Sequence, residues 1–288
     1  MTTIRASYSA MEQRLTAILR AGEGRAAARI IFEDVAGYSP KFIFVNGDRE
    51  MDDYMQTKVD AVAAKIEAGE PVQYAVGKAL FMGDMFTVTP AVLIPRPETA
   101  GLVDLITDRW ADKRDLRVLD LGTGSGCIAI ELAKALPFSE VKAVDISKDA
   151  LDVAAQNAKC LHASVTFENG DILALTPPKQ AMYDIIVSNP PYICTREEAD
   201  MDKRVKDYEP STALFVPDDD PMKFYRPIGK YAYAALRDGG QLFLEINSLY
   251  ADLTADTMRK AGFDKVETMR DFKGNYRFVV CTRSSKDA

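Results

Sequence analysis

The sequence predicts an α/β protein, in which a small helical domain is followed by a doubly wound, mostly parallel sheet of seven strands. Near the N-terminus, apolar residues recur every three or four positions, as they do on amphipathic helices. From Arg117 onward, short apolar runs alternate with helical patterns, which is typical of a doubly wound sheet. We therefore expect a helical N-terminal domain over residues 1–72, a β-hairpin linker over 73–96 and an α/β domain over 97–288.

Three segments of the N-terminal domain are predicted to be helical. Residues 26–35 are one of them, and apolar residues that line one helical face define the other two. Gly69 follows the second apolar set, where a glycine commonly ends a helix. The two sets are Ile4, Tyr8, Met11, Leu15 and Ile18, and Met55, Val59, Val62 and Ile66. Together the three helices predict a small bundle.

The linker changes from helical to β-prone sequence. Gly77 and Gly83 interrupt it, and glycine between extended pieces favours a tight turn. The β-prone pieces are residues 74–76, 80–82 and 86–88. We expect them to form a β-hairpin between the two domains.

Seven apolar runs are the predicted strands of the α/β domain. The link from Arg270 to Arg277 is too short for the crossover helix that a parallel pair needs, so the last two strands should pair antiparallel. The runs are residues 118–121, 141–144, 165–167, 185–187, 242–246, 266–269 and 278–281. A mostly parallel sheet that ends in an antiparallel hairpin resembles the class I methyltransferase fold more than a dinucleotide-binding dehydrogenase.

The composition argues against several classes of site. The four cysteines are widely scattered, with no CxxC pair, which argues against a zinc site and a disulfide framework. The only histidine, His162, lies in a polar stretch and is expected at the surface. One histidine excludes a His-cluster metal site and makes a Ser-His-Asp triad a poor candidate, so we expect no metal.

Charge and hydropathy indicate the cellular location of the protein and the partners that it is expected to lack. The formal net charge of −7 argues against attraction to a nucleic-acid backbone as the main source of affinity. No run approaches the ~18 apolar residues of a membrane span, and the first residues lack the apolar core of a signal peptide. We therefore expect a cytoplasmic protein without direct nucleic-acid or membrane partners.

A glycine-rich loop, Asp120-Leu121-Gly122-Thr123-Gly124-Ser125-Gly126, follows the first predicted strand of the sheet. Its glycines let the backbone approach a ligand closely at the carboxyl edge of the sheet, where ligands of such folds bind. The GxGxG spacing differs from the dinucleotide fingerprint GxGxxG and from the phosphate loop GxxxxGK[ST]. The alternative is a glycine-rich turn without a ligand.

Two acidic residues follow the next two predicted strands. Asp145 lies roughly 20 residues beyond the glycine loop, where a carboxylate accepts hydrogen bonds from ribose hydroxyls in both NAD and S-adenosylmethionine sites. Asp171 is placed to meet an adenine amino group, and Ile172 to pack on the ring. Taken singly, Asp145 suits a helix N-cap region and Asp171 a turn. Their joint placement favours a nucleoside site.

The run Asn189-Pro190-Pro191-Tyr192 ends a predicted buried strand. An amide nitrogen conjugated to a carbonyl or a ring is a poor nucleophile until acceptors hold its hydrogens. The side-chain oxygen of Asn189 and the carbonyl of Pro190 are suitable acceptors, and Tyr192 can stack on a flat group. The alternative is a simple strand-ending turn, and this run alone favours neither.

These segments resemble the motifs of the PrmC/HemK family of protein-glutamine methyltransferases. The similarity includes the glycine loop, residues 143–147, 169–171 and 187–193, and continues outside the core in residues 70–74, 93–99, 208–215, 224–226 and 239–246. It implies a class I S-adenosylmethionine-dependent methyltransferase. The N-terminal helices match the family only in type, but their apolar faces favour protein recognition, so we expect the helical domain to bind the substrate protein. The implied reaction methylates N5 of the glutamine in the Gly-Gly-Gln motif of peptide-chain release factors.

The resemblance also implies roles for individual residues. Asn189, Pro190 and Tyr192 would be catalytic, and Asn189 to Tyr192 would bind the substrate glutamine. The implied cofactor residues are Gly122, Thr123, Gly124, Ser125, Gly126, Asp145, Asp171, Ile172 and Asn189. The cofactor would be S-adenosyl-L-methionine, which leaves as S-adenosyl-L-homocysteine.

Two segments depart from the family pattern. Residues 247–250 (Asn-Ser-Leu-Tyr) stand where glycine and then glutamine are usual, and residues 216–221 replace a glycine-containing loop. Both lie away from the cofactor motifs, so they affect the expected substrate contacts. The sequence leaves the role of Arg96 open, whereas Glu98 suits the first turn of a helix that Pro97 begins.

Alternative functions share the same chemistry. A glutamine methyltransferase of a ribosomal protein would use the same motifs, and an N6-adenine methyltransferase of nucleic acid would suit Asn-Pro-Pro-Tyr equally well. The N-terminal domain, in which acidic residues are at least as numerous as basic ones, does not resemble a nucleic-acid-binding region. A protein that binds S-adenosylmethionine without catalysis is disfavoured by the intact substrate motif.

Overall fold

The computed structural model describes residues 2–284 and divides them into two compact units. The smaller unit consists of residues 2–78 together with Asp202–Tyr208. The larger unit consists of Ala79–Met201 and residues 209–284. Within residues 2–284, no helix combines the length and the apolar character needed to cross a membrane.

The smaller unit is a helical bundle, as the sequence predicts. Thr3 and Asp52 each accept a hydrogen bond from a backbone N–H in the first turn of the helix that follows. Leu15, Ile31 and Val59 are fully buried between the helices. The helices are α1 (Ile4–Thr16), α2 (Ala21–Asp34), α3 (Pro40–Asn46), α4 (Asp53–Glu67) and α5 (Val72–Val76), and α9 (Lys203–Tyr208) joins them from later in the chain.

One predicted β-prone piece is wrong, because residues 74–76 form the last turns of α5. Pro71 precedes this helix with an extended backbone, and Gly77 ends it with a positive φ of 80°. These two flanking residues favour a short helix over the β preference of Tyr74 and Val76. The sequence patterns also missed α3, which leaves Phe44 and Val45 exposed and therefore lacks a clear apolar stripe.

The middle of the linker forms a two-stranded sheet of β1 (Lys78–Phe81) and β2 (Asp84–Thr87). Only Met82 and Gly83 separate the strands, so the predicted hairpin is confirmed for this part of the linker. Phe81 and Phe86 pack edge to face with ring centroids 5.9 Å apart, and both are buried in the core of the larger unit. The hairpin is thereby tied to that unit.

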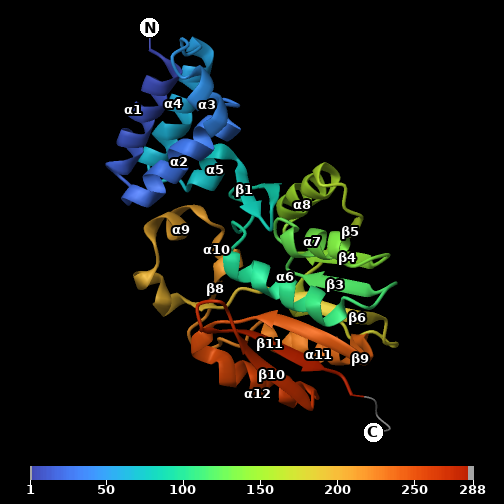
Figure 1. Ribbon diagram of the computed structural model, residues 1–288. Coiled ribbons are helices and arrows are strands. Elements are labelled where there is room, and N and C mark those ends of the chain that lie inside the picture. The colour runs from blue at the N-terminus through green and yellow to red at the C-terminus, as the bar shows by residue number, and fades with distance from the viewer. Residues whose placement is uncertain (1, 285–288) are drawn as a thin grey trace. The chain divides into compact units, whose positions relative to one another are not determined.

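The larger unit contains a seven-stranded sheet in the order β10-β11-β9-β6-β3-β4-β5 (Figure 1). Strands β9, β6, β3, β4 and β5 are parallel, and β11 is antiparallel to both β9 and β10, which confirms the predicted sheet. The strands are β3 (Arg117–Leu121), β4 (Glu140–Asp145), β5 (Val165–Asn169), β6 (Tyr183–Ser188), β9 (Leu236–Glu245), β10 (Lys265–Arg270) and β11 (Tyr276–Thr282).

Helices cover both faces of this sheet. On one face Ile130, Leu102 and Val118 belong to one buried apolar cluster, and on the other Ile228 and the neighbouring Leu119 belong to a second. Consecutive residues of β3 thus face opposite cores, as expected of a doubly wound sheet. The first face carries α6 (Pro97–Trp110), α7 (Cys127–Ala135) and α8 (Lys148–Cys160), and the second carries α11 (Tyr225–Ala235) and α12 (Ala251–Ala261).

The order of strands explains where a ligand can bind. From β3 the chain proceeds through β4 and β5 on one side, and then through β6 and β9 on the other. Ligands of open α/β sheets bind outside the carboxyl ends of the strands at this reversal. Short elements surround that edge: η1 (Ile172–Ala174), β7 (Ile193–Cys194), η2 (Thr195–Asp200), α10 (Ser211–Leu214), β8 (Phe215–Val216) and η3 (Ser248–Tyr250).

Candidate active site

A cavity of about 620 Å³ lies at the carboxyl ends of β3, β4 and β6, entirely within the larger unit. Its volume falls in the range of ~300–1,000 Å³ typical of small-molecule sites. The residues predicted to bind a cofactor come together here. Those that line the cavity are Gly122, Thr123, Gly124, Ser125, Asp145, Asp171, Ile172, Asn189 and Pro191. Gly126, Pro190 and Tyr192 do not line it.

The glycine loop joins β3 to α7 in a conformation that favours glycine. Gly122, Gly124 and Gly126 have φ values of 78°, 55° and 82°. A Cβ at Gly124 would meet no atom within 4 Å, so the backbone there is open to the cavity. A Cβ at Gly126 would lie 3.0 Å from Ala154 and Ile130, so this glycine allows close packing of α7 instead.

Asp145 at the end of β4 holds the glycine loop in place. Its Oδ2 accepts a hydrogen bond of 2.8 Å from the Gly124 N–H, and its Oδ1 accepts one of 2.9 Å from the Ser147 N–H. Each carboxylate oxygen can accept a further hydrogen bond. Asp145 also lines the cavity, so it can both support the loop and receive ligand hydroxyls.

Two apolar side chains beside the acidic residues are exposed toward the cavity. Ile146 is 64% exposed and Leu173 is 43% exposed, and both line the cavity. Asp171 accepts a 2.8 Å hydrogen bond from the Leu173 N–H and thereby caps η1, which is the turn-forming role that its residue type suggests. A flat aromatic ring would cover these apolar side chains and leave Asp171 at its edge.

Asn157 on α8 is a supporting residue that the sequence patterns did not single out. It is buried, its Oδ1 accepts from the Thr87 N–H at 2.7 Å, and its Nδ2 donates to the carbonyls of Thr87 and Ser125 at 3.0 and 2.9 Å. The side chain therefore ties the glycine loop to β2. The sequence feature that could have identified Asn157 is an amide residue among the apolar residues on one face of a helix.

Asn189 follows β6 and lines the cavity beside the glycine loop. Its Nδ2 donates to Thr99 Oγ1 at 3.3 Å, and Thr99 stands in the first turn of α6. Ser188, which precedes Asn189, donates from its hydroxyl to the Leu121 carbonyl at 2.6 Å. This buried bond joins the ends of β3 and β6, so the glycine loop and Asn189 are held side by side.

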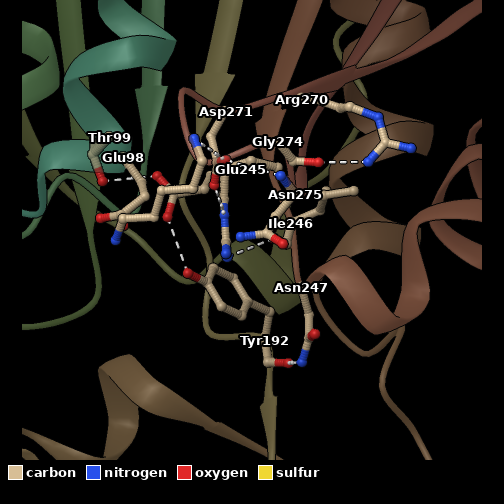
Figure 2. Close-up of polar contacts among 12 residues, drawn as sticks. Glu98, Thr99, Tyr192, Glu245, Ile246, Asn247, Arg270, Asp271, Gly274 and Asn275 are labelled. Atoms are coloured by element: carbon tan, nitrogen blue, oxygen red, sulfur yellow. Dashed lines mark hydrogen bonds and ion pairs between the residues drawn. The ribbon is translucent and has the colours of Figure 1, made fainter.

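Tyr192 is tied to a buried carboxylate rather than placed among the cavity residues. Its hydroxyl donates to Glu245 Oε1 at 3.0 Å, and Thr99 Oγ1 donates to Glu245 Oε2 at 2.7 Å. Figure 2 shows Thr99 and Tyr192 both directed toward Glu245. Burial raises the pKa of Glu245, and burial together with the Glu245 charge raises the pKa of Tyr192, which therefore remains a hydroxyl donor.

The unusual segment 247–250 supports the chain that follows Tyr192. Asn247 Nδ2 donates to the Tyr192 carbonyl at 3.3 Å (Figure 2). The same Nδ2 donates to the Glu197 carboxylate at 3.0 Å. The Tyr250 hydroxyl accepts from the Cys194 thiol at 3.4 Å and from the Arg196 guanidinium. Residues 247–250, which depart from the family pattern, thus make several contacts around β7.

The second unusual segment, 216–221, is also held by polar contacts. Asp218 accepts a 2.8 Å hydrogen bond from the Arg196 N–H, and Asp220 forms a 2.5 Å ion pair with Arg226. Val216 belongs to β8, which pairs with β7. This loop therefore fastens the same β7 region from its other side.

Arg96 and Glu98 stand on either side of Pro97 at the start of α6. Arg96 lines the cavity and forms a 2.5 Å ion pair with Glu209, whose side chain is 1% exposed and also accepts from the Ile94 N–H. Glu98 lies in the first turn of the helix and forms a 2.5 Å ion pair with Lys273. Arg96 therefore fixes one wall of the cavity.

Comparison with known proteins identifies the family. A methyltransferase domain model matches residues 112–267, and a model of the PrmC N-terminal domain matches residues 10–77. A release factor glutamine methyltransferase of Bacteroides thetaiotaomicron is 41% identical over 273 residues, which cover 95% of this chain and 98% of that protein. The chain belongs to the release factor glutamine methyltransferase family. A member from Streptococcus pneumoniae is 37% identical over 275 residues, 95% of this chain and 96% of its own.

The fold of the larger unit agrees with this family. A methyltransferase from Pyrococcus furiosus has a solved structure that aligns with a TM-score of 0.51 at 16% identity, over 77% of this chain and 98% of that one. At this identity the likeness concerns the fold alone, which is that of a class I methyltransferase. The chain is thus an S-adenosylmethionine-dependent methyltransferase.

The cavity fits S-adenosylmethionine in three respects. The open backbone at Gly124 admits a close ligand, the Asp145 carboxylate has acceptor capacity for hydroxyls, and the exposed Ile146 and Leu173 offer an apolar surface to a ring. Asp171 stands beside that surface. The assignment of each of these side chains to a part of the cofactor stays a prediction.

Proposed function

We propose that this site methylates the side-chain amide nitrogen, N5, of the glutamine in the Gly-Gly-Gln motif of peptide-chain release factors. The observation that carries the proposal is the position of Asn189, whose amide lines the same cavity as the glycine loop. Family membership supports the substrate, because the relatives from Bacteroides thetaiotaomicron and Streptococcus pneumoniae are release factor glutamine methyltransferases.

The site acts by positioning the substrate amide. Its nitrogen lone pair is delocalised into the carbonyl, so the two N–H groups need acceptors that favour a pyramidal nitrogen. The Asn189 side-chain oxygen, which lines the cavity, would supply one of them. The Pro190 carbonyl is the second acceptor that the sequence predicts, although Pro190 itself does not line the cavity. When bound, S-adenosylmethionine supplies a methyl group on a positively charged sulfur, which is already a good leaving group. The only histidine, His162, is exposed and does not line the cavity, so the proton is lost without a histidine base.

Substitution of Asn189 tests this proposal. Asn189→Ala should leave the affinity for S-adenosylmethionine within a few-fold and lower turnover by about 100-fold or more, because an acceptor for the reacting group is lost. Gln156→Ala removes an exposed amide from α8 and serves as the control. Cofactor affinity is measured by calorimetry, and turnover by transfer of labelled methyl. Undiminished methylation by Asn189→Ala would contradict the role of this residue.

The methylated residue identifies the substrate. The protein is incubated with labelled S-adenosylmethionine and, in separate reactions, with a release factor, ribosomal proteins or DNA, and the product is mapped by mass spectrometry. We expect label on the glutamine of Gly-Gly-Gln. Label on a ribosomal-protein glutamine or on adenine would support the alternative enzymes, and absence of label would support a non-catalytic binding protein.

We also propose that the helical unit recognises the release factor. Phe44 is 78% exposed and Val45 is 68% exposed on α3, and Tyr54 on α4 is exposed as well. Large apolar side chains on a polar surface are typical of protein-binding sites. This unit would supply affinity for the intact factor, while the cavity of the larger unit would act on the glutamine.

A further inference from the structure

We propose that Thr99 and Glu245 are positioning residues that fix the orientation of the Asn189 amide, so that its oxygen faces the substrate. The proposal rests on the function proposed for Asn189 as a hydrogen-bond acceptor. It concerns two residues that are far from Asn189 in sequence and that none of the expected site motifs assigned to the chemistry.

The contacts form a chain from the protein interior to the cavity. Glu245, at the end of β9, is 1% exposed, and its Oε2 lies 2.7 Å from Thr99 Oγ1. Thr99 Oγ1 in turn lies 3.3 Å from Asn189 Nδ2. Thr99 is itself buried in the first turn of α6, and Figure 2 shows its hydroxyl bonded to the Glu245 carboxylate.

The number of protons decides the direction of these hydrogen bonds. The Thr99 hydroxyl has a single proton, and this proton is donated to Glu245 Oε2. The Thr99 oxygen is then left as an acceptor toward Asn189. Asn189 must present its NH2 group to Thr99, because the alternative orientation would bring an amide oxygen against a hydroxyl oxygen whose proton is already used.

The orientation of the amide determines what the substrate meets. With its NH2 group held by Thr99, Asn189 directs its oxygen away from α6, and this side chain lines the cavity. A substrate NH2 group needs that oxygen as acceptor. A freely rotating amide would present its own NH2 group for part of the time and repel the substrate nitrogen, so a fixed orientation favours turnover.

Contacts with Tyr192 keep Glu245 in its acceptor role. Glu245 Oε1 accepts from the Tyr192 hydroxyl at 3.0 Å, and the positively charged Arg277 lies near the carboxylate and opposes the effect of burial on its pKa. Arg277 is held by the Ile246 carbonyl and by Asp271. One carboxylate thus anchors Asn189, through Thr99, and Tyr192 directly, at the two ends of the Asn189–Tyr192 run.

Two substitutions of Thr99 test the proposal. Thr99→Val has nearly the same shape but lacks the hydroxyl, and we expect kcat to fall about ten-fold while KM for S-adenosylmethionine changes less than about two-fold. Thr99→Ser restores the hydroxyl and should recover most of kcat. Thermal unfolding shows whether each variant is folded. If Thr99→Val does not bind cofactor, Thr99→Ala against Thr99→Ser gives the same comparison without the extra methyl group.

A double-mutant cycle shows whether Thr99 acts through Asn189. In single-turnover assays, adding Thr99→Val to Asn189→Ala should cause no further loss of rate, because there is no amide left to orient. A loss equal to that seen in the wild-type background would overturn the proposal, as would equal kcat for the valine and serine variants. If Asn189→Ala alone keeps full activity, the function proposed for Asn189 fails. If Asn189→Ala loses activity and Thr99→Val does not, only the role of Thr99 fails.

Discussion

Asp120, the last but one residue of β3, is a fully buried carboxyl group beneath the glycine loop. The Thr123 hydroxyl donates to its Oδ2 at 2.6 Å. Burial raises the pKa of Asp120 to about 7, since removal from water penalises the charged form. Burial likewise raises the pKa of Glu131 on α7 to about 7. Both groups therefore link the stability of this region to pH.

We expect the contribution of Asp120 to stability to fall as the pH rises from about 4 to about 7. In that window the folded protein retains the Asp120 proton, whereas the unfolded chain, with a pKa near 3.8, has lost it. The free energy of unfolding then decreases by up to about 1.4 kcal/mol per pH unit for this group. Asp120→Asn should make the stability fall less steeply with pH, while Glu131 and Glu245, whose pKa values burial also raises, keep their contributions. Urea unfolding at several pH values measures how the free energy of unfolding depends on pH. Asp152→Asn, at an exposed position, is the control. An unchanged slope in Asp120→Asn would contradict the assignment.

At the level of elements, the junction between β3 and α7 depends on positive φ angles, which glycine adopts without strain. Gly126 has a positive φ, and it also lies where a Cβ would contact Ala154 and Ile130. Gly274, in the link between β10 and β11, has nearly the same φ of 83° but open space around it. The two positions therefore separate backbone strain from steric contact.

Alanine substitution of these two glycines should have unequal effects. Gly274→Ala should cost about 1–2 kcal/mol from backbone strain alone. Gly126→Ala should cost more and should also weaken cofactor binding, since Ala154 or Ile130 must move and the loop moves with them. Unfolding free energies and cofactor affinity measured for both variants test this. Equal losses of unfolding free energy in Gly126→Ala and Gly274→Ala would show that the close approach of Gly126 to Ala154 on α8 is unimportant.

The elements differ in how well the sequence predicts them. Five strands of the large sheet, β3, β4, β6, β9 and β11, contain buried apolar residues, and the edge strands β5 and β10 contribute partly buried ones, so the apolar pattern is visible locally. The ladder of β7 and β8 has two residues per strand and was not predicted. Tyr250, far along the sequence, contacts Cys194 of β7, and Asn247 and Asp218 bond to Glu197 and Arg196 of the adjoining η2. Such short elements have no periodicity of their own.

At the scale of the whole molecule, each of the two units is built from two separate stretches of the chain, a division that the sequence patterns do not reveal. The segment Asp202–Tyr208 lies between β7 and β8 of the larger unit in the sequence but belongs to the helical unit. There the Tyr208 hydroxyl donates to the Ala68 carbonyl at 3.0 Å, and Arg204 pairs with Glu23. Removing the N-terminal helices would leave this segment without its partners, so substitutions are a better test than truncation.

The double substitution Phe44→Asp, Val45→Asp tests the role of the helical unit. Both side chains are exposed, so the fold should be retained and cofactor affinity should not change. We expect KM for the intact release factor to rise about ten-fold or more, because an apolar docking surface becomes charged. Activity on a short Gly-Gly-Gln peptide should stay the same. Lys41→Asp on the same helix is a control for added charge. Equal KM values for the variant and the wild type would place recognition elsewhere.

The sequence by itself determined the α/β class, the sheet and the glycine loop, because periodic burial and glycine spacing are local properties of a chain. It also pointed to Asn189 as an amide placed for chemistry. Only the tertiary structure decided how that amide is supported: Thr99 and Glu245 are 146 positions apart, and Asn189 lies 90 positions from Thr99. A pattern of burial shows that a polar residue is inside the protein, whereas the choice of its hydrogen-bond partner depends on how the strands and helices meet.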